Sequence, residues 1–335
     1  MSFSSEAIRA LAVLCTAGAS FAAFALEPVR IGLVRSASAA PLYIAVAAGH
    51  FKDEAVDPQL RFFATDEAVS QAAAAGQLDL GLVNLSAPFY ATAAARGFKL
   101  IASQASDQTG FPMYAFLIGK KPRKAGFAAR DLLNQRIGMP GIDAGPNYAL
   151  FSLETRFGLD PAAIELVRLK TPARELSALS HGQIDAVLLP FPAALRSVQK
   201  GASVLPLSDL VQWQAAAVFT TVQTIAAKRP LIERFMRAYQ HGTGEYQVNF
   251  LQYDDGGDFI PGPRHDEYEA VISRQSRVPV ALLAKTKTYC DRRANLDAAD
   301  IQKQVKFWQD QGRLDKGIDA AALLDLSFIG EEVIH

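Results

Sequence analysis

A short segment occurs twice in this chain, and the duplication constrains the fold more than any other feature. The first copy covers residues 76–83 (GQLDLGLV) and the second residues 182–189 (GQIDAVLL). Each copy follows a helical run rich in Ala and Leu, over 67–75 and 172–180. The leading glycine allows the left-handed conformation in which helices end, and the apolar run that follows is typical of a buried parallel strand. The repeat therefore predicts two similarly built α/β lobes.

The remaining sequence alternates short β runs with helical runs, which indicates βαβ units. A strand over 29–34 precedes a helix over 41–48 that ends at Gly49, and a second strand covers 59–63. Long helices are expected over 229–251 and 297–311, with Asp297 as N-cap of the second and Gly312 after its end.

Two apolar β runs, over 111–118 and 216–224, are expected to carry the chain from the first lobe to the second and back. They place residues 26–115 and 220–335 in lobe 1 and residues 116–219 in lobe 2.

The first 25 residues have the pattern of a secretory signal peptide. Arg9 precedes an apolar run over 10–17, and small residues follow up to the A-x-A pattern at 23–25. We expect cleavage near Leu26 and a periplasmic mature protein. No later apolar run approaches the roughly 20 residues of a membrane span.

Charge and cysteine content exclude several classes of function. Lys plus Arg and Asp plus Glu number 34 each, whereas nucleic-acid binding needs a basic face. Cys290 is the one cysteine after the leader, so an intrachain disulfide and a cysteine-based zinc site are excluded. The five histidines show no metal-binding spacing, and no nucleophile elbow, P-loop or dinucleotide-binding motif occurs. We therefore predict no catalytic residues, no metal and no cofactor.

Four β-to-α junctions carry a proline at or beside the start of the helix. They cover residues 38–41, 84–88, 141–146 and 190–192. A proline in the first turn leaves the other free backbone N–H groups directed into the loop, and the helix dipole adds attraction for anions. Two junctions fall in each lobe, so facing lobes would bring four helix N-termini to one cleft.

The predicted ligand site takes its residues from these junctions. Arg35 ends the first strand and can pair with a carboxylate or sulfonate through two parallel hydrogen bonds; the alternative is a solvated loop arginine. Several aromatic residues are either pocket walls or core, namely Tyr43, Phe89, Tyr114, Phe191 and Trp213. The predicted ligand-binding residues are Arg35, Ser36, Ser38, Pro41, Tyr43, Asn84, Ser86, Asp143, Gly145, Asn147, Pro190 and Phe191.

The two aspartates of the repeat, Asp79 and Asp185, are interpreted as structural. Both lie where a strand begins, whereas ligands of open α/β sheets bind at the carboxyl ends of the strands.

Several segments together resemble the SsuA/THI5-like (NMT1-type) periplasmic binding proteins of ABC importers. The resemblance lies in residues 30–32, 40–45, 49–51, 76–88, 131–138 and 297–312. It implies a type 2 periplasmic-binding fold, an α/β architecture of two Rossmann-like lobes joined by two hinge strands that closes on a ligand. It also implies a monomer that delivers this ligand to an ABC permease in the inner membrane. Members bind alkanesulfonates, taurine, nitrate, bicarbonate, pyrimidine precursors of thiamin or aromatic acids.

The sequence thus predicts a solute-binding protein for a small organic anion, a sulfonate or carboxylate that can be aromatic. A neutral heteroaromatic such as a thiamin-precursor pyrimidine is the alternative ligand. Two other classes stay open: a secreted enzyme on the same fold, with Asp143 or His181 as base, and a sensory or chaperone-like binding protein without a permease. One family branch makes a pyrimidine from its own histidine, but its Cys-rich motif is absent here.

Overall fold

The computed structural model describes most of the chain after the predicted leader. The described residues are 26–119, 132, 135–139, 141, 143–158, 164–169, 171–198 and 202–329. The predicted signal peptide, residues 1–25, lies outside them. Within these ranges, no helix combines the length and the apolar character that crossing a bilayer requires.

The first sheet has the strand order β2-β1-β3-β10-β4. Its first three strands are parallel, and β10 runs antiparallel to both β3 and β4. The strands are β1 (Glu27–Val34), β2 (Val56–Phe63), β3 (Leu80–Asn84), β4 (Phe98–Asp107) and β10 (Trp213–Thr221). The helices between β1 and β4 are η1 (Ala37–Ala39), α1 (Ala40–Ala48), α2 (His50–Asp53), α3 (Asp66–Ala74) and α4 (Ala87–Arg96).

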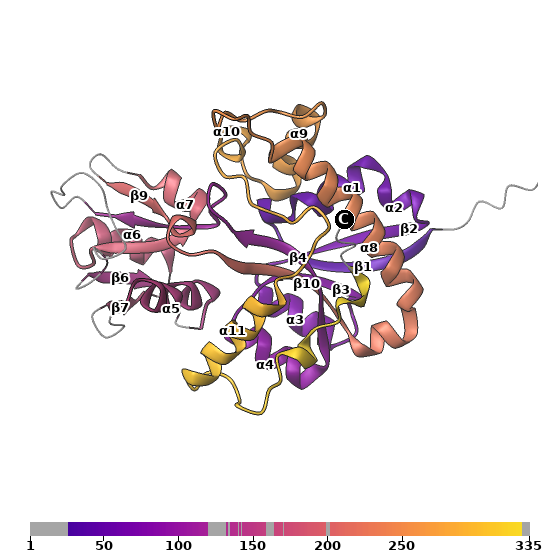
Figure 1. The fold of residues 1–335 in the computed structure, drawn as a ribbon, viewed down its shortest axis with the longest axis horizontal. Coiled ribbons are helices and arrows are strands. Elements are labelled where there is room, and N and C mark those ends of the chain that lie inside the picture. Colours follow the sequence, from indigo (N-terminus) through magenta and orange to yellow (C-terminus); the bar gives the residue numbers. More distant parts are fainter. Residues whose placement is uncertain are drawn as a thin grey trace, which may run out of the picture.

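The second sheet repeats this plan with the order β7-β6-β8-β5-β9, in which β5 is antiparallel to β8. Its strands are β5 (Tyr114–Ile118), β6 (Arg136–Met139), β7 (Glu165–Arg168), β8 (Ala186–Pro190) and β9 (Ser203–Pro206). Its helices are α5 (Gly145–Phe157), α6 (Pro172–Ser180), α7 (Phe191–Arg196) and η4 (Leu207–Asp209). The two sheets and their helices form two lobes, as predicted, and the connections between the lobes leave the first sheet from β4 and enter it at β10 (Figure 1).

The C-terminal part of the chain returns to the first lobe. It comprises α8 (Val222–Phe250), α9 (His265–Ser276), α10 (Val280–Leu283), α11 (Ala298–Asp310), η5 (Ala321–Leu323) and η6 (Leu326–Phe328). Asp297 caps α11 as predicted, because its side chain accepts a hydrogen bond from the Asp300 N–H. The helix predicted from 229 begins earlier, and its backbone is kinked at Lys228, two residues before Pro230.

The chain crosses between the lobes in two short connections, residues 108–113 and 207–212, which we call the first and second crossings. The β run predicted over 111–118 starts only at Tyr114 and lies in the second sheet. The strand predicted over 216–224 ends at Thr221, because the Thr221 side chain caps α8 by accepting from the Thr224 N–H. The first crossing therefore ends two residues before the predicted boundary at 115/116, and the second ends seven residues before the predicted boundary at 219/220.

The repeated aspartates hold a neighbouring strand in place, which confirms the structural interpretation. Asp79 accepts hydrogen bonds from the backbone N–H, Nε and Nη2 of Arg30, each at 2.9 Å. Asp185 accepts the same three groups of Arg136 at 3.0–3.3 Å. Lys228 adds a fourth bond to Asp79 at 2.9 Å. Burial alone would raise the pKa of Asp79, but the Arg30 and Lys228 hydrogen bonds outweigh it and lower the pKa to about 2.

We expect Asp79→Asn to destabilise the protein by about 2 kcal/mol at pH 7, since an amide leaves one buried N–H donor of Arg30 without an acceptor. The pKa of Asp79 lies below its unfolded value, so this stabilisation is present above about pH 4 and disappears as the pH falls through 2. Urea unfolding at pH 7 and pH 3 measures both effects. Equal stability of variant and wild type at pH 7 would contradict the prediction.

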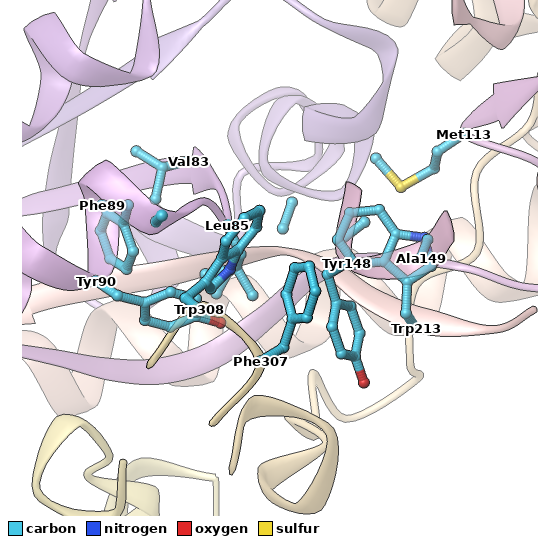
Figure 2. Packing of buried hydrophobic residues seen from close by; sticks show 14 of the residues in the cluster. Val83, Leu85, Phe89, Tyr90, Met113, Tyr148, Ala149, Trp213, Phe307 and Trp308 are labelled. Atoms are coloured by element: carbon cyan, nitrogen blue, oxygen red, sulfur yellow. The ribbon is translucent and has the colours of Figure 1, made fainter. Parts of the chain in front are cut away.

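One apolar cluster extends through both lobes. It contains Leu85 and Trp213 of the first sheet region, Tyr148 of α5, and Phe307 and Trp308 of α11. Figure 2 shows Phe307, Tyr148 and Trp213 in a row, with ring centroids 5.8 and 6.1 Å apart. The Tyr148 hydroxyl donates to Asp300 Oδ1 at 2.5 Å. Helix α11 therefore bridges the lobes, a contact that the sequence did not predict.

Candidate functional site

The four predicted proline junctions are present at the carboxyl ends of parallel strands. They lead from β1, β3, β6 and β8 into α1, α4, α5 and α7, and the proline is the second residue of each helix. Two of these strands belong to each sheet. The prediction of two Pro-started helices per lobe is confirmed.

Two of the junctions touch across the lobes. The Ala87 N–H, at the start of α4, donates to the Asp143 carbonyl in the loop before α5 at 3.2 Å. Gly145, the first residue of α5, lies so close to the first lobe that a Cβ on it would be 2.4 Å from the Leu85 carbonyl oxygen and 2.8 Å from the Trp213 ring. The loops β3–α4 and β6–α5 thus meet directly.

Arg35 follows β1 and is held on two sides. Its guanidinium carbon lies 3.5 Å from the centroid of the Phe62 ring, at the end of β2. Its Nη1 donates to the Gln275 carbonyl at 2.9 Å, near the end of α9. Both contacts fix the side chain without neutralising its charge, and no carboxylate of the described residues pairs with it.

Polar side chains cluster beside Arg35 around η1. The hydroxyls of Ser36 and Ser38 lie 2.7 Å apart, and Gln104 Nε2 donates to Ser38 Oγ at 3.1 Å. Helical side chains lean toward the N-terminus, so Tyr43 of α1 extends back toward Ser36. Burial raises the pKa of Tyr43 to about 12. Gln104 was not predicted; it lies in β4 among small and polar residues, with no local signal of function.

The predicted residues at the β3–α4 junction position the loop. Asn84 donates its side-chain amide to Asp66 Oδ2 at 2.9 Å and its backbone N–H to Asp66 Oδ1 at 3.2 Å. Burial raises the pKa of Asp66, the first residue of α3. Ser86 caps α4 by accepting from the Phe89 N–H. Pro41 is buried in α1.

The predicted residues of the second lobe differ in exposure. Asp143 is half-exposed and lies 3.5 Å from Arg313, just beyond α11. Asn147 is buried in the first turn of α5. Pro190 is exposed at the end of β8. Phe191 is largely buried, and its N–H donates to the Met113 carbonyl of the first crossing at 2.8 Å.

The aromatic candidates separate into two groups. Phe89 lies in the core, within 5.8 Å of Tyr90 and 5.3 Å of Phe219 between ring centroids. Tyr114 and Trp213 instead meet across the lobes, with centroids 6.2 Å apart.

The alternative catalytic base His181 lies away from the junctions. It caps the C-terminal end of α6, where its Nδ1 is 2.7 Å from the Ser177 carbonyl oxygen. This end of α6 leads into the start of β8, whereas Asp143 follows the carboxyl end of the parallel strand β6. His181 and Asp143 therefore lie at opposite ends of the strands. Across the part of the chain that the structure describes, no group of three or more His, Cys, Asp or Glu side chains is arranged to hold a metal ion.

The sequence and the fold are similar to those of several known proteins. The taurine-binding periplasmic protein of Escherichia coli K12 is 28% identical over 285 residues, 82% of each chain. The aliphatic sulphonate-binding protein SsuA of Escherichia coli superposes with a TM-score of 0.69 at 15% identity, covering 89% of this chain and 92% of that one. The desulfurization enzyme DSZB has a TM-score of 0.59 at 13% identity, covering 90% and 97%.

The likeness to solved structures establishes the fold, which is the predicted periplasmic-binding-protein fold. A family model described as NMT1/THI5 like matches residues 36–249, well over half of the chain. The matched region contains the η1 cluster, the two repeat copies and all four helix N-termini. The chain therefore belongs to the NMT1/THI5-like family.

Proposed function

We propose that this protein is the extracytoplasmic solute-binding component of an ABC importer and that it captures a small organic anion, a sulfonate or carboxylate, between its lobes. A relative that binds taurine and a fold neighbour that binds aliphatic sulphonates support this class of ligand. Both are binding proteins by name, which supports a role without turnover.

The observation that carries the proposal is the uncompensated charge of Arg35. The Phe62 ring and the Gln275 carbonyl hold the guanidinium in place, while no described carboxylate neutralises it. A fixed guanidinium with unused N–H donors suits a planar carboxylate or a sulfonate. The neighbouring start of α1 adds the favourable end of a helix dipole.

The second lobe would complete the site by closure. In the proposed mechanism, the ligand anion binds first to the lobe that carries Arg35, and the N-termini of α5 and α7 then approach it. Closure is favoured only to the extent that the ligand gains contacts in the closed state. A closed monomer would then dock on a permease of the inner membrane, after export directed by residues 1–25.

A thermal-shift screen tests the class of ligand. Taurine, alkanesulfonates, aromatic carboxylates, nitrate, bicarbonate and thiamin-precursor pyrimidines would each be added to the purified protein. A true ligand at 100 times its Kd adds about 2.7 kcal/mol of stability. Stabilisation by anions alone supports the proposal, whereas stabilisation by a pyrimidine alone would select the heteroaromatic alternative. Recovery of the bound compound chemically unchanged would exclude the enzyme alternative.

We expect Arg35→Ala to weaken binding of an anionic ligand by about 1.5–3 kcal/mol, the value of hydrogen bonds to a charged group. Isothermal titration calorimetry measures the change. Arg61→Ala is the matched control, because Arg61 is an exposed arginine of β2 that also donates to a backbone carbonyl, that of Gln77. Unchanged affinity in Arg35→Ala would remove Arg35 from the site.

A further inference from the structure

Asp107 is a fully buried carboxyl group at the point where both crossings meet. It is the last residue of β4, and its Oδ1 accepts from the Met113 N–H, at the end of the first crossing, at 3.0 Å. Its Oδ2 accepts from the Trp213 indole N–H, at the end of the second crossing, at 3.4 Å. Met113 and Trp213 lie on the same side of the apolar cluster in Figure 2.

Additional hydrogen bonds tie the two crossings to each other. Thr109 Oγ1 donates to the Ser208 carbonyl at 3.2 Å, and Gln212 Nε2 donates to Thr109 Oγ1 at 2.8 Å. In the part of the chain that the structure describes, the connections 108–113 and 207–212 are the two places where the chain passes between the sheets. A rotation of one lobe against the other must therefore change the backbone around Asp107.

The surroundings of Asp107 raise its pKa above the usual range of an aspartate. Burial raises the pKa of Asp107 to about 7, although the N–H groups of Met113 and Trp213 lower it in part. The other ionisable groups that face it are Asp209 of η4, whose negative charge raises the pKa further, and the Tyr114 hydroxyl of β5. No cationic side chain of the described residues pairs with it.

We propose that Asp107 is a positioning residue for ligand capture: its carboxyl group takes up a proton when the two crossings close around it and releases the proton when the lobes open. The inference rests on the proposed function in assuming that the lobes close on a ligand. Its physical basis is that a charged carboxylate without a cation is costly in a dry site and regains water when the crossings loosen. Lower pH should then favour the closed form.

Small-angle X-ray scattering of the ligand-free protein between pH 6 and pH 8 tests this coupling without any ligand. We expect a smaller radius of gyration at pH 6 and a transition near neutral pH. Asp107→Asn cannot titrate and should show the same radius at both pH values. A wild-type radius that does not change with pH, or a transition that persists in Asp107→Asn, would overturn the proposal and leave the proposed function untouched.

Two milder variants identify the titrating group even where Asp107→Asn fails to fold. Trp213→Phe keeps an aromatic ring but removes an N–H donor that favours the carboxylate, so the transition should move to higher pH. Asp209→Asn, at an exposed position, removes a nearby negative charge, so the transition should move to lower pH. Loss of the transition in Asp209→Asn would assign it to Asp209 and refute the role of Asp107.

Once a sulfonate ligand is found, its affinity should be up to about tenfold higher at pH 6 than at pH 8.

Discussion

Substitution of Gly145 by alanine is expected to weaken ligand binding strongly while leaving the protein folded. The new Cβ would lie 2.4 Å from the Leu85 carbonyl oxygen and 2.8 Å from the Trp213 ring, both in the other lobe. A backbone oxygen cannot rotate out of the way, so the lobes must separate. Overpacking of this kind costs about 1–3 kcal/mol, which corresponds to a loss of affinity of about 5- to 150-fold if the closed state is the one that binds.

The expected effect is specific to the contact between the lobes. The φ angle of Gly145 does not lie in the left-handed region, and alanine is the better helix former at the start of α5. Each lobe by itself should therefore tolerate the change, and urea unfolding should show a folded protein whose loss of stability is limited to the contacts between the lobes. Isothermal titration calorimetry gives the affinity, and small-angle scattering should show a larger radius of gyration for the ligand-bound variant.

Gly141→Ala is the matched control for this experiment. Gly141 precedes the same helix, and a Cβ on it would meet nothing within 4 Å. The control should bind ligand as the wild type does. If Gly145→Ala also retained full affinity, the close approach of the β6–α5 loop to Leu85 would not be part of the binding-competent state.

The sequence predicted the fold well where local signals and the repeat agree. The duplicated glycine is a short-range signal, and the structure places Gly76 and Gly182 at the same positive φ of 70°. Pro41 and Gly49 likewise marked the limits of α1, and Asp297 and Gly312 those of α11, within one or two residues. The limits of β10 were less predictable, because Thr221, Val222 and Thr224 suit a strand as well as a helix start and the capping bond decides.

The candidate site was predictable in its chemistry but not in its contacts. The proline junctions follow from the sequence, because proline fixes the helix start locally. The hydrogen bond from Asn84 to Asp66 joins residues 18 positions apart, and the bond from Arg35 to Gln275 joins residues 240 apart. No rule based on the spacing of residues in the sequence predicts such pairs. For the same reason the sequence did not show that Asp107 and Trp213 meet, 106 positions apart, at the two crossings.

The helices that precede the two repeat copies differ in chemical character at one equivalent buried position. Glu175 of α6 lies seven residues before Gly182, as Val69 of α3 lies seven residues before Gly76. Val69 and Glu175 are both completely buried. Neither carboxyl oxygen of Glu175 has a hydrogen-bond partner among the residues that the structure describes, and burial raises the pKa of Glu175 to about 7. The second lobe thus carries an acidic group where the first has an aliphatic side chain.

We expect Glu175→Leu to stabilise the protein by about 1–2 kcal/mol at pH 8, which is less than the 1.4 kcal/mol per pKa unit that a fully dry site would give, because solvent screens part of the charge. The folded-state pKa lies above the unfolded value of about 4.3, so the folded protein binds more protons between these two values. The wild type therefore loses stability as the pH rises from about 4.5 to 7, and above that range the loss is complete. The advantage of Glu175→Leu should grow over the same window and then stay constant.

Urea unfolding of wild type and variant at pH 5, 6, 7 and 8 measures this difference. The buried Asp107 also lowers the stability as the pH rises, but it does so equally in wild type and variant, so its effect cancels in the difference between them. Glu175→Gln separates charge from polarity, because the amide cannot ionise but remains a buried polar group: its stability relative to wild type should rise with pH in parallel with that of Glu175→Leu, from a lower starting value. A stability difference that does not depend on pH in either variant would show that Glu175 stays neutral, or stays solvated, throughout the range.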